Sequence, residues 1–224
     1  MSALAEAARE VRITAGNAAL SGTLGVPDSA NGVVLFAHGS GSSRFSPRNA
    51  YVARELQRAR VGALLFDLLT PDEERRDGLT REYRFDIALL ATRLVAATRW
   101  LDAQQECSRL PIGYFGASTG SAAALLAAAE LGTRIAAVVS RGGRPDLAGE
   151  AALSRVTAAT LLIVGSHDDE VIELNRDAYA HLRATKELAI VRGASHLFEE
   201  PGTLEEVARL AARWFAIHLG TGSP

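Results

Sequence analysis

The sequence predicts an α/β protein whose mostly parallel sheet is covered by helices on both faces. The first observation is a series of short, uninterrupted apolar runs, which are typical of strands buried on both sides. The second is that longer segments with helical patterns separate these runs, so that successive strands need crossover connections and pair in parallel. The third is the length of 224 residues, which suits a single domain over residues 1–224.

The chain opens on a predicted antiparallel hairpin, because two alternating stretches at residues 11–15 and 19–26 flank Gly16 and Asn17. Together with six buried runs, the hairpin gives a sheet of about eight strands. The buried strands are predicted at residues 33–37, 63–66, 112–115, 135–139, 161–164 and 188–191. The helices are predicted at residues 47–60, 84–105, 118–131, 171–183 and 203–219.

The closing helix has clear sequence signals. Thr203 precedes Glu206 by three residues, which predicts a capping box with Thr203 as the N-cap. Trp214 and Phe215 belong to a helical apolar pattern, so we assign both to the core. An opening hairpin, six buried strands and a long closing helix give an element order that resembles that of the α/β hydrolases.

The composition is that of a soluble globular protein, with 48% apolar and 22% charged residues. The net charge of −2 gives no electrostatic reason to expect nucleic acid as a partner. The single cysteine, Cys107, excludes an intramolecular disulfide and fits a reducing compartment. The first ten residues lack the apolar core of a signal peptide, and no run approaches about 18 apolar residues. We therefore expect a cytoplasmic protein without a membrane partner.

A G-x-S-x-G motif lies near the middle of the chain, where Gly116 and Gly120 flank Ser118 between an apolar run and an alanine-rich helix. In this context a serine is held on a sharp strand-to-helix turn with its hydroxyl exposed. The turn leaves no room for a Cβ at either glycine, and the helix N-terminus faces the place where negative charge develops. The motif predicts a nucleophilic serine, although alone it fits a glycine turn without chemistry equally well.

A serine nucleophile needs a general base and an acid that orients the base, in the chain order serine, acid, histidine for hydrolases of this type. His196 follows the last predicted strand, and Asp168 and Asp169 follow the strand before it. Both positions lie at carboxyl ends of parallel strands, where open α/β sheets place their sites. We predict Ser118, His196 and Asp168 as the catalytic residues. Asp169 stays open as the alternative acid or as a cap of the next helix.

The remaining histidines are assigned other roles. His181 and His218 lie on predicted helices, where packing or solvent exposure is the expected role. His167 lies beside the two acids, but no second histidine accompanies it at ligand spacing, so we predict no metal site. The predicted chemistry needs no organic cofactor either.

The oxyanion that forms on attack needs two backbone N–H donors. Thr119, directly after the nucleophile, is the predicted first donor. The second is expected from the glycine-containing loop after the strand at residues 33–37, with Ser40 as the preferred donor and Gly41 as the next. His38 in the same loop is predicted to brace it from beneath.

The same loop imitates a dinucleotide-binding fingerprint, because Gly39 and Gly41 follow a strand and Asp67 ends the next strand. The position of the third glycine holds Arg44 instead. This alternative also leaves the serine motif and the later acid and histidine unexplained, so we rank it behind hydrolysis.

These motifs resemble those of the dienelactone-hydrolase-like branch of the α/β hydrolases over nearly the whole chain. The resemblance covers the opening hairpin, the last helix and the segments 38–44, 116–120, 164–168 and 193–196. It implies a compact fold with little or no lid, in which only the charged segment at residues 68–84 is long enough to cover a site. Dienelactone hydrolases proper carry a cysteine nucleophile, whereas this chain has Ser118. The resemblance therefore implies hydrolase chemistry and leaves the dienelactone substrate in doubt.

Four arginines fall on loops near the expected site, and a planar guanidinium pairs well with a substrate carboxylate. They are Arg44, Arg48, Arg141 and Arg144. Among them, Arg44 and Arg141 are predicted substrate contacts, together with Gly41. The alternative is that these arginines are solvated or bind loop carbonyls.

Taken together, the motifs predict a cytoplasmic serine hydrolase, a carboxylesterase acting on small or short-acyl esters. Its partner is then a small-molecule ester, and no cofactor is needed. Alternatives on the same residues are an acyltransferase or perhydrolase and a dienelactone or lactone hydrolase. A non-catalytic binding module is a further alternative, which predicts a broken Ser-His-Asp set. The sequence leaves open whether the protein is a monomer or a homodimer.

Overall fold

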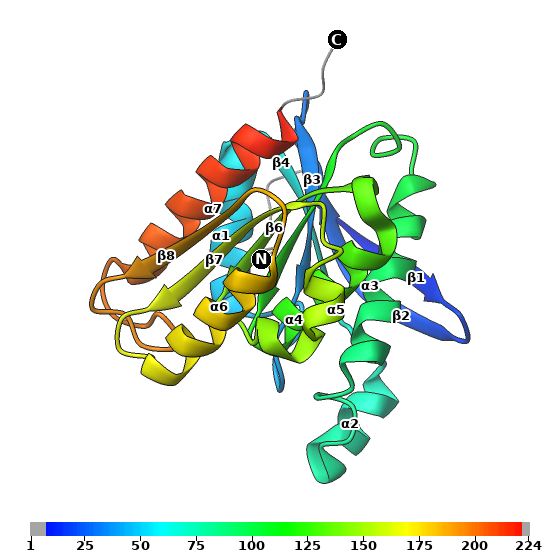
Figure 1. Cartoon of the computed structure of the whole chain (residues 1–224). Coiled ribbons are helices and arrows are strands. Elements are labelled where there is room, and N and C mark those ends of the chain that lie inside the picture. The colour runs from blue at the N-terminus through cyan, green and yellow to red at the C-terminus, as the bar shows by residue number, and fades with distance from the viewer. Residues whose placement is uncertain (1–7, 221–224) are drawn as a thin grey trace.

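The fold is described from a computed structural model that covers residues 8–220 (Figure 1). Residues 1–7, part of the segment in which we predict no signal peptide, lie outside the described residues, as do residues 221–224. The described strands form one sheet in the order β1-β2-β4-β3-β5-β6-β7-β8. They are β1 (Arg9–Ala15), β2 (Ala18–Gly25), β3 (Gly32–Ala37), β4 (Val61–Phe66), β5 (Ile112–Ala117), β6 (Ile135–Arg141), β7 (Ala159–Gly165) and β8 (Lys186–Val191).

Strand direction follows the prediction from sequence. β1 and β2 form the antiparallel hairpin, and β2 pairs antiparallel with β4. All further pairs, from β4 and β3 across to β7 and β8, are parallel. Every residue of β3, β4, β5 and β7 is buried, as their uninterrupted apolar sequences require. The predicted fold class, a mostly parallel eight-stranded α/β sheet, is confirmed.

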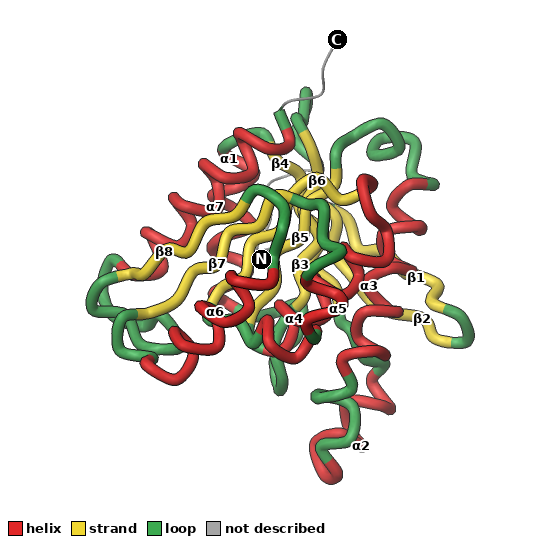
Figure 2. Tube along the Cα trace, in the orientation of Figure 1, coloured by secondary structure: helices red, strands yellow, loops and turns green. Residues whose placement is uncertain are grey.

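Helices cover both faces of the sheet (Figure 2). On one face, α1 (Pro47–Arg58) and α7 (Thr203–Leu219) enclose a core that includes Leu56, Trp214 and Phe215. The second core lies under α3 (Ile87–Asp102), α4 (Thr119–Leu131), α5 (Glu150–Leu153) and α6 (Asp169–His181). Two short 3-10 turns, η1 (Gly132–Arg134) and η2 (Pro145–Ala148), complete the connections. No helix within residues 8–220 combines the length and apolarity needed to cross a membrane.

The predicted assignment of Trp214 and Phe215 to the core is confirmed. Trp214 and Phe215 are buried, and the Trp214 Nε1–H donates to the carbonyl of Ala159 at 3.1 Å. Cys107 is also buried, which raises the pKa of its thiol to about 11. The thiol is therefore protonated at neutral pH.

The predicted capping box of the last helix is wrong. Gly202, with φ of 81°, is the N-cap of α7, and Thr203 is already the first helical residue. The Thr203 hydroxyl donates to the carbonyl of Glu200 at 2.7 Å, and Glu206 pairs with Arg209 instead of reaching back. The N-cap of α7 therefore lies one residue earlier than the capping-box pattern predicts, because Gly202 adopts the left-handed conformation there.

A helix that was not predicted, α2 (Pro71–Thr80), has the capping box instead. The amide of Glu73 donates to the Thr70 hydroxyl at 3.3 Å, and the amide of Thr70 donates to the Glu73 carboxylate at 2.7 Å. Pro71 occupies the first turn, where its missing N–H costs nothing. In Figure 1, α2 projects away from the sheet.

The topology gathers five strand ends at one edge of the sheet. Because β3, β5, β6, β7 and β8 are parallel neighbours in that order, their carboxyl ends meet there. In the register of these pairs, Ala37 lies opposite Gly116, and Ala117 lies opposite Arg141. The residues predicted for chemistry lie at these strand ends or in the segments that directly follow them.

Candidate active site

Ser118 occupies the sharp turn between β5 and α4. Its backbone has φ of 50° and ψ of −124°, a conformation that a residue with a Cβ adopts only at an energetic cost. A Cβ at Gly116 would lie 2.5 Å from the Cα of Ser121, and one at Gly120 would lie 2.1 Å from the carbonyl oxygen of Ala37. The two glycines are therefore required by space, as the motif predicts.

Hydrogen bonds fix this turn to its neighbours. The amide of Ser118 donates to the carbonyl of Arg141 at 3.3 Å, and the Ser118 carbonyl accepts from the amides of Ser121 and Arg144, each at 3.1 Å. The backbone on both sides of the serine is thus held, which maintains the strained conformation. Ser118 is half-buried and directly follows the carboxyl end of β5.

His196 and Asp168 are in direct contact. The His196 Nδ1–H donates to Asp168 Oδ2 over 2.6 Å, because a carboxylate can only accept. Neutral His196 therefore carries its lone pair on Nε2, the nitrogen that a general base uses. Asp169 is exposed and begins α6, so of the two adjacent acids the structure brings Asp168 to the histidine.

The loop that carries His196 packs closely on the end of β7. The amide of His167 donates to the carbonyl of Ala194 at 2.9 Å, and the Ser166 hydroxyl accepts from the amide of Gly193 at 2.8 Å. Glu200 accepts from the amide of Ser195 at 3.1 Å, and hydrogen bonds from Ser195 lower the pKa of this carboxyl. The position of the imidazole is thus supported from both ends of its loop.

Ser118 and His196 line the same cavity, which has a volume of about 270 Å³. Its other walls come from the loop between β3 and α1, from the start of α1 and from the end of β6. The further lining residues are Gly39, Ser40, Ser42, Ser46, Arg48, Asn49, Ala117, Arg141, Gly142 and Leu197. Asn49, which is 2% exposed, was not singled out from the sequence, where nothing marks it as different from a surface residue of the first helix.

The two predicted oxyanion donors are neighbours. The Ser40 and Thr119 side-chain oxygens lie 3.0 Å apart and share a hydrogen bond. Gly39 packs directly on the turn that holds Ser118, since a Cβ at Gly39 would lie 3.0 Å from Ser118 Cβ. The loop after β3 and the N-terminus of α4 thus flank the serine, and both the helix dipole and backbone amides favour negative charge at this point.

His38 is buried beneath the loop. Its Nε2 accepts from the amide of Leu68 at 3.1 Å, and its Nδ1 lies 3.0 Å from the carbonyl of Gly39. Burial lowers the pKa of this imidazole, despite raising contributions from that carbonyl, Asp67 and Glu74. His38 connects two loops as a neutral side chain, which is the bracing role that we predict.

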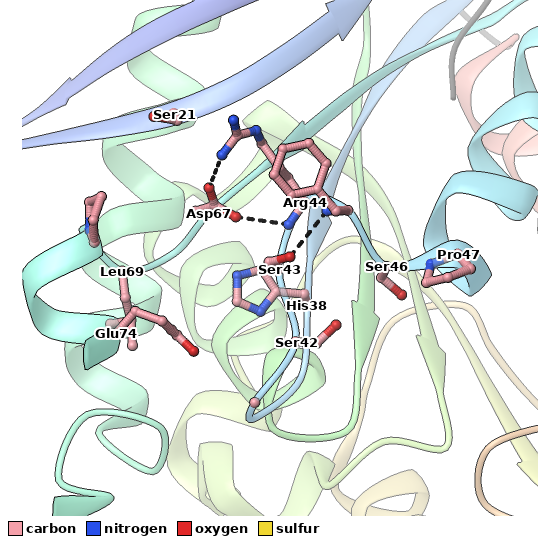
Figure 3. Close-up of a pocket in the computed structure, with 13 residues that line it drawn as sticks. Ser21, His38, Ser42, Ser43, Arg44, Ser46, Pro47, Asp67, Leu69 and Glu74 are labelled. Atoms are coloured by element: carbon pink, nitrogen blue, oxygen red, sulfur yellow. Dashed lines mark hydrogen bonds and ion pairs between the residues drawn. The ribbon is translucent and has the colours of Figure 1, made fainter. Parts of the chain in front are cut away.

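Arg44 is bound within the protein rather than facing Ser118. Its amide donates to Asp67 Oδ1 at 2.8 Å, and its guanidinium pairs with the same carboxylate (Figure 3). Arg44 and Gly41 line a neighbouring cavity of about 560 Å³, and neither lines the cavity of Ser118 and His196. The Asp67 carboxylate is thus already paired, which removes the ribose contact on which the dinucleotide alternative depends.

The segment at residues 68–84 packs beside the glycine loop. Ser40 Oγ donates to the carbonyl of Arg84 at 3.3 Å, and the segment helps to line the neighbouring cavities through Leu69 and Glu74. None of its residues lines the cavity of Ser118. The segment at residues 68–84 therefore does not cover the cavity of Ser118.

The other loop arginines differ in their partners. Arg144 donates to both carboxylate oxygens of Asp146, at 2.9 and 2.8 Å, and Arg48 pairs with exposed Glu199 at 3.2 Å. Arg141 lines the cavity, and the contact that its guanidinium makes is with the Phe198 ring, 5.8 Å from the ring centroid. Of the three predicted substrate contacts, the structure places Arg141 alone in the cavity of Ser118.

The strand order, together with the sharp turn at Ser118 between β5 and α4, defines the chain as an α/β hydrolase. A dienelactone hydrolase from Anabaena variabilis is 55% identical, with a TM-score of 0.92 over 95% of this chain and 99% of its own. The chain belongs to the dienelactone-hydrolase-like family of α/β hydrolases. The protein Est1E from Butyrivibrio proteoclasticus has the same fold, with a TM-score of 0.78 at 15% identity over 94% of this chain and 98% of its own.

Two curated proteins from strains of Mycobacterium tuberculosis are each 56% identical over 210 residues. The match covers 94% of this chain and 46% of each relative, so the chain spans about half the length of these relatives. Both carry the provisional name phosphoribosyl transferase. No protein-family model matches the sequence.

Proposed function

We propose that the protein is a serine carboxylesterase that cleaves small esters through an acyl-enzyme on Ser118. The observation that carries this proposal is the hydrogen bond of 2.6 Å between Asp168 and His196, whose imidazole shares a cavity with the strained Ser118. A nucleophile, a base and an orienting acid are the parts that acyl transfer needs. The volume of about 270 Å³ suits a small substrate.

Acylation begins when Ser118 Oγ attacks the ester carbonyl carbon and its proton passes to His196 Nε2. Asp168 holds the imidazole and stabilises the imidazolium that forms. The carbonyl oxygen becomes an oxyanion, which the N–H groups of Ser40 and Thr119 bind at the N-terminus of α4. The C–O bond to the alcohol then breaks, and His196 returns the proton to the leaving oxygen.

Deacylation repeats these steps with water. His196 Nε2 takes a proton from water, the resulting hydroxide attacks the acyl carbon, and the same N–H groups bind the second oxyanion. Collapse breaks the bond to Ser118 Oγ, which recovers its proton from His196. The products are one carboxylic acid and one alcohol, and no step requires a metal or an organic cofactor.

The names of the relatives bear on the substrate in different ways. A lactone is a cyclic ester, so the dienelactone hydrolase name of the Anabaena variabilis relative fits the same bond-breaking steps. The phosphoribosyl transferase name belongs to proteins of about twice the matched length. The fold and the cavity of this chain support hydrolysis, and we propose no phosphoribosyl transfer for it.

Replacing the nucleophile tests the proposal. In Ser118→Ala we expect hydrolysis of 4-nitrophenyl acetate to fall by about 10⁶-fold, the loss typical of a serine hydrolase without its nucleophile. We also expect the variant to lose covalent labelling by a fluorophosphonate, measured as a mass increase of the intact protein. Peptide mapping of the labelled wild type should locate the adduct at Ser118.

Ser121→Ala is the matched control, because Ser121 lies three residues after Ser118 in α4, is buried and does not line the cavity. This variant should retain both hydrolysis and labelling. Full turnover by a correctly folded Ser118→Ala protein would refute the proposed nucleophile.

A further inference from the structure

Arg141 is a buried charge that has no ionic partner among residues 8–220. Its side chain is 7% exposed, and its Nε is buried with no acceptor within hydrogen-bonding distance. In the described chain, neither a carboxylate nor a carbonyl accepts from its guanidinium, and the Phe198 ring at 5.8 Å offers only a weak contact. A guanidinium stays protonated in proteins, so it cannot avoid this situation by losing its charge.

The charge is retained although the surroundings oppose it. Burial and the neighbouring Arg48 lower the pKa of Arg141 to about 10, which leaves the side chain charged at pH 7. An unpaired buried charge is expensive, and proteins normally pair such groups or place them where a ligand pairs them. The buried Arg141 guanidinium is therefore unfavourable on its own, and a bound anion would stabilise it.

Four other arginines whose side chains are at least partly buried differ from Arg141, because each of them pairs with a carboxylate. Arg84 pairs with Asp77, Arg93 with Glu73, and Arg144 with Asp146. Arg44 pairs with Asp67 in the same way. The fold thus supplies a carboxylate to each of these side chains and none to Arg141.

The cavity around Arg141 is positively charged. Arg48 also lines this cavity, and none of the described aspartates and glutamates does. The Arg48 Nε is likewise buried without a partner, although its Nη1 reaches exposed Glu199 at 3.2 Å. Two arginine side chains, Arg48 and Arg141, therefore line one small space.

Arg141 is also adjacent to the nucleophile. It lies opposite Ala117 across the β5–β6 pair, and its carbonyl accepts from the amide of Ser118. A group bound by the guanidinium would thus belong to the same small molecule whose ester Ser118 attacks.

We propose that Arg141 and Arg48 form an anion subsite, and that the substrate is an ester bearing a carboxylate or a phosphate. Each guanidinium presents parallel N–H donors that fit two oxygens of such a group. The subsite deepens the proposed function, because it names the chemical class of substrate. Its binding step does not depend on catalysis, which allows the two proposals to be tested separately.

Calorimetric titration of the Ser118→Ala protein with inorganic phosphate, with succinate and with neutral succinamide tests the subsite. We expect at least one anion to bind and succinamide not to bind. Adding Arg141→Gln should weaken anion binding by about 10- to 100-fold, as loss of hydrogen bonds to a charged group implies. A tighter Kd for phosphate than for succinate would assign the phosphate class, and the reverse order the carboxylate class.

Arg144→Gln is the matched control, because Arg144 follows Arg141 by three residues, pairs with Asp146 and does not line the cavity. It should leave the Kd unchanged. If Arg141→Gln does not fold, Arg141→Lys keeps the charge but loses the planar fork, and we expect binding weakened several-fold. Absence of anion binding, or equal binding with and without the Arg141 guanidinium, would overturn the subsite.

A kinetic arm separates this inference from the esterase proposal. With Ser118 present, 4-nitrophenyl hydrogen succinate should be preferred over neutral 4-nitrophenyl butyrate, and Arg141→Gln should remove that preference in kcat/KM. Anion binding that requires Arg141 without hydrolysis of either ester would refute the esterase and keep the subsite. Hydrolysis of both esters without preference, together with unchanged anion binding in Arg141→Gln, would refute the subsite alone.

Discussion

Asp168 and Asp169 are consecutive residues with different environments. Asp168 has 16% of its side chain exposed and accepts from His196, whereas Asp169 is exposed at the start of α6. The loop that carries both acids packs closely on the loop that carries His196, since a Cβ at Gly165 would lie 2.4 Å from the carbonyl oxygen of Ala194. The two loops are thus in contact, and Asp168 is the acid turned toward the histidine.

This difference predicts opposite outcomes for two neighbouring substitutions. Asp168→Asn keeps the size of the side chain but no longer stabilises the imidazolium or the required tautomer, so we expect kcat for 4-nitrophenyl acetate to fall by about 10⁴-fold. Asp169→Asn should retain the wild-type kcat. Steady-state kinetics of both variants would decide, and equal losses in the two would contradict the assignment.

At the residue scale, strand ends were predictable and side-chain partners were not. Ser118, Asp168 and His196 follow buried strands, so their approximate meeting place can be inferred from chain order alone. Arg44 follows a strand and Arg141 ends one, yet Arg44 pairs with Asp67, whereas Arg141 has no carboxylate partner within residues 8–220. Such pairings depend on loop paths and on residues distant in sequence, which local patterns do not encode.

At the scale of elements, α2 is held by a single buried carboxylate. Asp77 is 1% exposed and accepts from the amides of Tyr83 and Arg84, at 2.8 and 2.9 Å. The Arg84 Nε–H donates to its second oxygen at 2.6 Å. Burial alone would raise the pKa of Asp77, but these hydrogen bonds outweigh it and lower the pKa. Asp77 therefore fixes the return from α2 toward the glycine loop.

Removing this charge should loosen α2 locally. In Asp77→Asn we expect the amides of residues 71–84 to exchange about 10- to 100-fold faster, because hydrogen bonds to a charged acceptor are lost. Hydrogen–deuterium exchange followed by mass spectrometry measures this effect. Asp72→Asn on the same helix removes only an exposed pair with Arg75 and should exchange as the wild type does. Unchanged exchange in Asp77→Asn would contradict this role.

The two Thr-x-x-Glu patterns show what limits prediction of elements. Thr70 and Glu73 form a capping box, whereas Thr203 and Glu206 do not. Pro71 sets a helical φ directly after Thr70, while Gly202 adopts a positive φ and becomes the N-cap before Thr203. The buried strands were predicted well because their pattern depends on burial alone, but the position of a cap depends on the conformation of the preceding residue.

At the scale of the whole molecule, stability should depend on pH through His38. Burial lowers the pKa of this imidazole, so below about pH 6.5 the unfolded chain takes up a proton that the folded protein resists. The free energy of unfolding is therefore expected to fall as the pH drops from 6.5, and to be insensitive to this group above it. Urea unfolding between pH 5 and 8 measures the dependence.

His38→Gln should reduce this dependence, because glutamine can still accept from Leu68 but does not titrate. His167→Gln serves as the control, since that side chain is exposed, and should follow the wild-type curve. Parallel pH curves for wild type and His38→Gln would show that another group is responsible.

The division of the site among five strand ends also affects folding. Ser40, Ser118, Arg141, Asp168 and His196 follow or end β3, β5, β6, β7 and β8, which pair only after long stretches of chain have been closed into loops. Contacts between residues distant in sequence are the slow part of folding, whereas helices form early. Recovered hydrolysis after dilution from denaturant is therefore a stricter measure of correct folding than recovered helical signal, since it requires the central parallel strands to be in register.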